Sequence, residues 1–273
     1  MKTRSEGDAL RDLVPPISRA RGFRLYDRRG RRYLDLFLNH GSAVLGHRPF
    51  RVDSEVKAVI SRGGLFAMPS AYPGRLARAL GRAYPAFAGV LVAASDAEAL
   101  GFAARYLKCG PSEIEIRDPA LGQDGRVIRD RPGLPLAARE DAMRGAEVVF
   151  PVLPFRLGDA PCPVLFRAGA PEGKPAWIAP AVAAAALRAF HDLDRRVQPQ
   201  WYRDDLLRGC EAWVQRGIYV TPRFTADRYA AVFRRFLEAG VLLPPEYPGP
   251  AVLPGEASAG ELALLMRLFG EKT

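Results

Sequence analysis

One stretch of the sequence has residue types and spacing that could bind a ligand. It is a short apolar run that leads directly into a helix-start motif. The run covers residues 88–94, and Ser95-Asp-Ala-Glu98 follows at once. A serine followed three residues later by a glutamate is the capping-box pattern, in which both side chains accept hydrogen bonds from otherwise unpaired amides at the helix start. A strand that feeds a helix start is also a common phosphate-binding device, because free amides and the helix dipole converge there. Ser95, Asp96 and Ala97 stand where such an anion would bind, but Asp96 brings a negative charge and Ala97 has no hydroxyl, so we interpret the motif as a helix cap and expect no phosphate to bind there.

The cysteines and histidines do not form a recognisable site. Cys109, Cys162 and Cys210 are far apart and include no C-x-x-C pair, and the three histidines are equally scattered. This spacing is typical of buried free thiols. We therefore expect neither a metal centre nor a redox pair.

The net charge of +10 raises the question of nucleic-acid binding. Only five of the 40 basic residues are lysines, so 35 are arginines, and they spread along the whole chain. A cluster between Arg19 and Arg32 falls on a turn between two strand-like runs, whereas a groove binder would need its charge on one face. We interpret the arginines as solvated surface and expect no nucleic-acid partner.

The pattern of apolar residues predicts a two-domain α/β protein. Period-two and continuous apolar runs predict a hairpin over 22–38 and strands over 88–94, 114–116, 127–128, 147–153, 164–166 and 218–220. Helical spacing predicts helices over 53–62, 74–83, 95–107, 180–197, 201–215, 227–239 and 260–269. The run over 88–94 is typical of a parallel sheet buried on both faces. A β-rich start, an α/β middle and an α+β end favour a second domain built from both termini.

Membrane insertion and export are not expected. No apolar run approaches the ~18 residues that a bilayer-spanning helix needs. The segment Met1–Asp12 is charged and has no apolar signal core. We therefore expect a cytoplasmic protein.

Several motifs occur in the order typical of one family. The stretch RGFRLYDRRGRRYLDLFLNHGSAVLGHRPF (Arg21–Phe50) resembles the N-terminal signature of the class III aminotransferases. LVAASDAEALGFAAR (Leu91–Arg105) resembles their strand, phosphate turn and helix. RYAAVFRRFLEAGVLLPP (Arg228–Pro245) resembles the C-terminal domain of the glutamate-1-semialdehyde aminomutase branch. The signature positions that match are Gly22, Tyr26, Asp27, Gly30, Tyr33, Asp35, Gly46, His47 and Pro49.

This resemblance implies the fold of the pyridoxal-phosphate-dependent transferases (fold type I), in shortened and degenerate form. It implies a small α+β domain from residues 1–45 and 179–273 and a reduced large α/β domain over 46–178. It also implies a homodimer, and amino transfer through a lysine Schiff base.

Such chemistry needs a phosphate cup, a carboxylate on the pyridine nitrogen and a lysine. The resemblance places Asp96 and Ala97 where the family has Gly and Ser or Thr. It places Pro151 where the family has the acid. The lysine position falls on Ala168, and a shift of register would make Lys174 the Schiff-base residue instead. The family's Tyr-His-Gly element is not found over 109–150.

The main hypothesis is therefore a pseudoenzyme without transaminase activity, for which no cofactor is expected, acting as a homodimer or as a heteromer with an intact aminotransferase. The alternative is a divergent aminotransferase or aminomutase that uses Lys174 and pyridoxal phosphate. A third hypothesis is a small-molecule binding module in a cleft between the two domains, with Arg156 and Arg167 as anion contacts.

Overall fold

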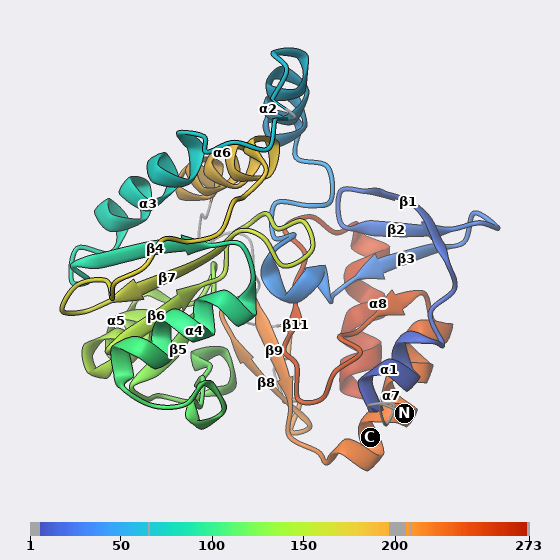
Figure 1. Ribbon diagram of the computed structural model, residues 1–273. Coiled ribbons are helices and arrows are strands. Elements are labelled where there is room, and N and C mark those ends of the chain that lie inside the picture. The colour runs from blue at the N-terminus through green and yellow to red at the C-terminus, as the bar shows by residue number, and fades with distance from the viewer. Residues whose placement is uncertain (1–5, 65, 197–205, 208, 272–273) are drawn as a thin grey trace. The chain divides into compact units, whose positions relative to one another are not determined.

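The computed structural model describes residues 6–64, 66–196, 206–207 and 209–271, and the chain divides into two compact units (Figure 1). Unit 1 comprises Met1–Arg48 and Val197–Thr273, and unit 2 comprises Pro49–Arg196. The sequence placed the second boundary at residue 178 instead. The difference arises because α6 (Pro180–Arg196) packs on α2 (Phe50–Ser61) and α3 (Tyr72–Ala83), both of which lie in unit 2.

Unit 2 is built on a four-stranded sheet in the order β4-β7-β6-β5. The strands are β4 (Gly89–Ala93), β7 (Cys162–Phe166), β6 (Val148–Pro151) and β5 (Val127–Asp130). β5 and β6 are parallel, and β7 is antiparallel to both of its neighbours. The parallel setting expected for β4 is therefore wrong, because its sheet partner in this unit is the one reversed strand, β7.

Helices cover both faces of this sheet. Neighbouring residues of each strand point to opposite faces, so a continuous apolar run fills two cores. One core packs the sheet against α3, α6 and α5 (Leu136–Gly145), and the other packs it against α4 (Asp96–Leu107). In β6, for example, Val149 belongs to the first core and Val148 to the second.

Unit 1 contains two sheets and helices from both chain ends. The first sheet has the order β1-β2-β3-β10 and the second β11-β9-β8. The strands are β1 (Ile17–Arg21), β2 (Arg24–Asp27), β3 (Arg32–Asp35), β8 (Trp213–Arg216), β9 (Tyr219–Pro222), β10 (Val241–Leu242) and β11 (Ala251–Val252). The helices are α1 (Glu6–Arg11), α7 (Ala226–Glu238), α8 (Ala259–Gly270) and the 3-10 turn η1 (Leu38–Gly41). The predicted hairpin over 22–38 is present as β2 and β3.

The N-terminal signature residues stabilise the loops of unit 1. Asp35 is buried and accepts a 2.8 Å hydrogen bond or ion pair from Nε2 of His47. Gly46 has φ +85°, and a Cβ there would lie 3.1 Å from the carbonyl oxygen of Gly22. Only glycine combines that backbone angle with that close approach at low cost. The signature thus has a structural role in this chain.

Three further predictions differ from the structure. Residues 114–116 form no strand, and only Arg117 makes an isolated bridge to Ile128. Helix α5 lies over residues for which the sequence pattern predicted neither a helix nor a strand. The helix predicted over 201–215 falls partly outside the described residues, and its end is strand β8. Trp213 and Val214 fit a strand because aromatic and β-branched side chains pack well on a pleated surface.

Candidate functional site

The candidate site lies at one edge of the unit 2 sheet, namely the edge formed by the ends of the strands and not by an outermost strand. The carboxyl ends of β4, β5 and β6 meet there, together with the start of the reversed strand β7. The register pairs Ala93 with Cys162 and Asp130 with Pro151. Helix α4 begins at the same edge, directly after β4 (Figure 1).

Ser95 is the N-cap of α4. Its hydroxyl oxygen accepts a 3.1 Å hydrogen bond from the amide of Glu98. Glu98 in turn accepts from the amide of Ala94 at 2.7 Å and from the amide of Ala176 at 2.6 Å. The serine half of the predicted capping box is present, while the glutamate reaches one residue further back than the motif requires. Ser95 therefore caps the helix, while Glu98 connects the helix start to the residue before the cap and to the segment at Ala176.

Asp96 places its carboxylate at the first turn of α4, where the helix dipole favours negative charge. One oxygen accepts a hydrogen bond from the thiol of Cys162 at 2.9 Å, and the other pairs with Arg156 at 3.0 Å. Burial works against ionisation of Asp96, but the hydrogen bonds from Cys162 and Arg156 outweigh it, so its pKa is lowered. Ala97, the next residue, is exposed and offers no polar side chain.

Cys162 is buried, and its thiol faces this carboxylate. Burial at the start of β7 raises the pKa of the Cys162 thiol, and the hydrogen bond and negative charge of Asp96 raise it further. The thiol is therefore a hydrogen-bond donor at neutral pH and not a thiolate nucleophile.

Asp130 is a buried carboxylate at this edge that the motif comparison missed. It lies beside Pro151, the residue that the sequence comparison placed at the position of the family's acid. Tyr84 donates to Asp130 at 2.6 Å, and Arg139 contributes two further bonds, at 2.8 and 2.6 Å. Both carboxylate oxygens are thus engaged within the unit. The signal in the sequence was an acid close behind the apolar pair at 127–128.

The candidate lysine, Lys174, is exposed on the segment between β7 and α6. Its neighbour Gly173 lies beside Phe102 and Arg105 of α4, and the amide of Ala176 donates to Glu98. The segment that carries Lys174 therefore runs alongside α4.

Ala168 lies at the opposite edge of the sheet, where β4 and β6 begin. It comes just after the end of β7, and its amide donates to the hydroxyl of Tyr106 in the last turn of α4. Because β7 is reversed, a residue after this strand cannot reach Ser95. The register that matched Ala168 to the lysine position therefore does not bring it to the start of α4.

The two arginines proposed as anion contacts have protein partners. Arg156 pairs with Asp96 and donates to the carbonyl of Asp159 at 2.7 Å. Arg167 donates to the carbonyl of Ala146 at 2.6 Å and to that of Met143. Arg156 thus joins the start of α4 to the loop before β7, and Arg167 binds the carbonyl groups at the end of α5.

The described residues contain no group of three or more His, Cys, Asp or Glu side chains that could hold a metal ion. The three cysteines are free thiols. No helix within the described ranges is long and apolar enough to cross a bilayer.

Sequence comparison identifies a relative of similar length. An uncharacterized protein of Treponema pallidum is 30% identical over 292 residues, covering 87% of this chain and 88% of that protein. A glutamate-1-semialdehyde 2,1-aminomutase of Heliobacterium modesticaldum is 36% identical over 92 residues, which is 34% of this chain and 21% of the aminomutase. The chain thus matches about a fifth of the length of that enzyme. No protein-family model matches the chain.

Solved structures match the fold over nearly the whole chain. An ornithine aminotransferase of Plasmodium yoelii has a TM-score of 0.70 at 14% identity, covering 97% of this chain and 98% of that one. An omega-transaminase of Sphaerobacter thermophilus has a TM-score of 0.65 at 15% identity, covering 94% and 90%. The fold class predicted from the sequence is confirmed. The chain belongs to the same family as the Treponema pallidum protein and has the fold of the class III pyridoxal-phosphate aminotransferases.

Proposed function

We propose that this chain is an aminotransferase-like pseudoenzyme that neither transfers amino groups nor forms a covalent bond with pyridoxal phosphate. The observation that carries the proposal is the carboxylate of Asp96 at the start of α4, held there by Cys162 and Arg156. It occupies the position at which a bound phosphate would need free amides and no negative charge.

The negative charge of Asp96 disfavours a phosphate at this helix start. At an effective dielectric of about 20, two like charges about 4 Å apart repel by roughly 4 kcal/mol. Ser95 uses its hydroxyl oxygen as the helix cap and has only its hydroxyl proton left to donate, and Ala97 has no hydroxyl to offer. These residues do not fit a phosphate dianion.

The described lysines support the same proposal. Lys57 lies on α2 and pairs with Asp53 at 3.0 Å. Lys108 caps the C-terminal end of α4, at the opposite end of that helix from Ser95. Lys174 is exposed. The loop over 152–161, which joins β6 to β7 at the Ser95 edge, contains no lysine.

The remaining requirement is a carboxylate for the pyridine nitrogen. Asp130 lies at the correct edge, but Arg139 and Tyr84 already satisfy its two oxygens. If Asp130 turned to the pyridine nitrogen, the guanidinium of Arg139 and the hydroxyl of Tyr84 would lose their partner at a partly buried position, which costs free energy. Asp130 therefore does not fit the role of partner to the pyridine nitrogen.

The test is incubation of the purified protein with pyridoxal phosphate, borohydride reduction and peptide mapping by mass spectrometry. We expect no saturable absorbance at roughly 400–430 nm, where such aldimines absorb. We also expect Lys174→Ala to behave like the matched surface variant Lys57→Ala. Stoichiometric reduction on Lys174, lost only in Lys174→Ala, would establish the alternative of a divergent enzyme.

We further propose that the protein is cytoplasmic and acts as a homodimer or in a heteromer with an intact aminotransferase. Supporting this proposal, the chain keeps the aminotransferase fold over nearly its full length although its site residues differ. Light scattering on the purified chain, alone and mixed with a class III aminotransferase from the same cell, measures the assembly. A monomeric mass in both samples would contradict it.

A further inference from the structure

Unit 2 contains a cavity of about 400 Å³ beside β4, the outermost strand on one side of its sheet. Its walls come from the first turns of α3, from the middle of β4, and from the segments 67–70 and 175–178. The volume lies within the range of sites that hold small organic molecules. It is separate from the charged cluster around Asp96, none of whose members lines it.

The walls of this cavity are uncharged. None of its lining residues is Asp, Glu, Lys, Arg or His, although the chain as a whole has 70 acidic and basic residues. The indole of Trp177 forms one wall and is held in place by a 2.9 Å hydrogen bond from its nitrogen to the carbonyl of Met68. A charged ligand would lose its hydration there without a counter-charge, so the walls select for a neutral molecule.

Polar groups are available in the wall that β4 forms. β4 is an edge strand, so alternate residues direct their amide and carbonyl groups away from β7. Three consecutive residues of β4, Val90 to Val92, line the cavity, and at least one of them must present such groups.

We propose that this cavity is a binding site for a neutral, mostly apolar small molecule that carries one hydrogen-bonding group. The apolar body packs between Trp177 and Ala77 of α3, and its polar group bonds to the free backbone groups of β4. The site is independent of the proposed loss of transaminase chemistry, because it shares no residue with the start of α4.

A glycine in the wall permits a clean test. Gly74 lies in α3, and a Cβ added there would have no other atom within 4 Å. Gly74→Leu therefore fills the cavity without a clash at Cβ and improves helix propensity. Gly101→Leu is the matched control, since Gly101 lies in α4, has equally open space and does not line the cavity.

The probe is 2-naphthol, which is neutral at pH 7, and its charged counterpart is naphthalene-2-sulfonate. Equilibrium dialysis of the full chain measures both. We expect saturable one-to-one binding of 2-naphthol, at least about tenfold weaker binding of the sulfonate, and a loss of about tenfold or more in Gly74→Leu but not in Gly101→Leu.

Three outcomes would overturn the proposal. The first is no saturable binding of 2-naphthol up to its solubility. The second is equal binding by wild type and Gly74→Leu. The third is a dimer in sedimentation that Gly74→Leu, but not Gly101→Leu, dissociates, because a second copy of the chain would then be the occupant.

Discussion

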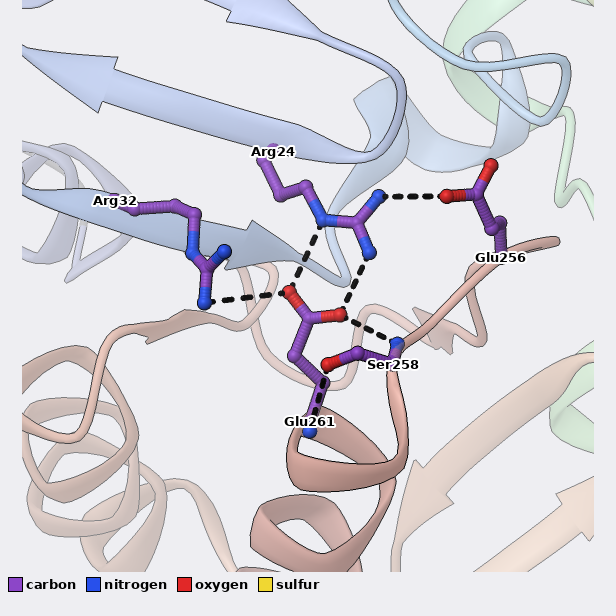
Figure 2. Close-up of polar contacts among 5 residues, drawn as sticks. All are labelled: Arg24, Arg32, Glu256, Ser258 and Glu261. Carbon is purple, nitrogen blue, oxygen red and sulfur yellow. Dashed lines mark hydrogen bonds and ion pairs between the residues drawn. The ribbon is translucent and has the colours of Figure 1, made fainter.

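Arg24 donates two hydrogen bonds to the carboxylate of Glu261, from Nε at 3.0 Å and from a terminal nitrogen at 2.6 Å (Figure 2). The pair connects β2 to the first turn of α8 across 237 residues of sequence. Glu261 also accepts from the amide of Ser258 at 2.7 Å, which completes a capping box. A carboxylate thus serves as both an ion-pair partner and a helix cap.

This arrangement predicts acid-sensitive stability. Hydrogen bonding to Arg24, opposed by burial and aided by Ser258, lowers the pKa of Glu261 from 4.5 to about 2. The contribution is fully present above pH 4.5 and is lost as the pH falls from about 4.5 towards 2. We expect Glu261→Gln to cost about 2–3 kcal/mol at pH 7 and little near pH 2.

Urea unfolding followed by the fluorescence of the buried Trp213 measures the effect in unit 1. Glu256→Gln is the control, because Glu256 contacts the same Arg24 at 3.5 Å but is 79% exposed. We expect a change of less than about 0.5 kcal/mol for it. An equal loss in both variants would show that the capping and the bidentate geometry contribute nothing.

The Asp130 cluster predicts a large stability loss on truncation. Asp130→Ala leaves the guanidinium of Arg139 and the hydroxyl of Tyr84 without their shared acceptor, at an expected cost of about 3 kcal/mol. Asp141→Ala removes an exposed pair with Arg144 and should cost about 0–0.5 kcal/mol. Urea denaturation by circular dichroism compares them, and similar losses would contradict the prediction.

The N-cap of α4 predicts a smaller effect. Ser95→Ala removes the acceptor for the amide of Glu98 and should destabilise unit 2 by about 1 kcal/mol. Ser95→Thr keeps a hydroxyl and should recover most of the loss. Thermal unfolding of the three proteins checks this, and a Thr variant no better than Ala would rule out the capping role.

The thiol of Cys162 should be the slowest of the three to react. Its pKa is raised by burial and by Asp96, and it is buried, whereas Cys109 and Cys210 are partly exposed. Alkylation with iodoacetamide at pH 8, read by peptide mass spectrometry, should label Cys162 last. Asp96→Asn removes one cause of the raised pKa and should speed the reaction. Labelling of Cys162 as fast as that of Cys109 would show that the thiol is accessible and ionised.

Local patterns predicted the elements whose signals are contained in a few neighbouring residues. Helix α7 follows from its apolar face, the hairpin of β2 and β3 from its turn, and the cap of α4 from Ser95. These succeed because periodicity and capping depend on residues three or four positions apart. The family motifs, which are also short, led to the correct fold class.

The sequence by itself determined the aminotransferase fold and the helix start at Ser95. Only the tertiary structure decided that β7 runs against its neighbours, which sends Ala168 to the far edge of the sheet. It also decided that Asp96 meets Cys162 across 66 residues, and that Asp130 meets Tyr84 across 46. Strand order and direction control these contacts, and they arise from packing between distant segments, which no local pattern encodes.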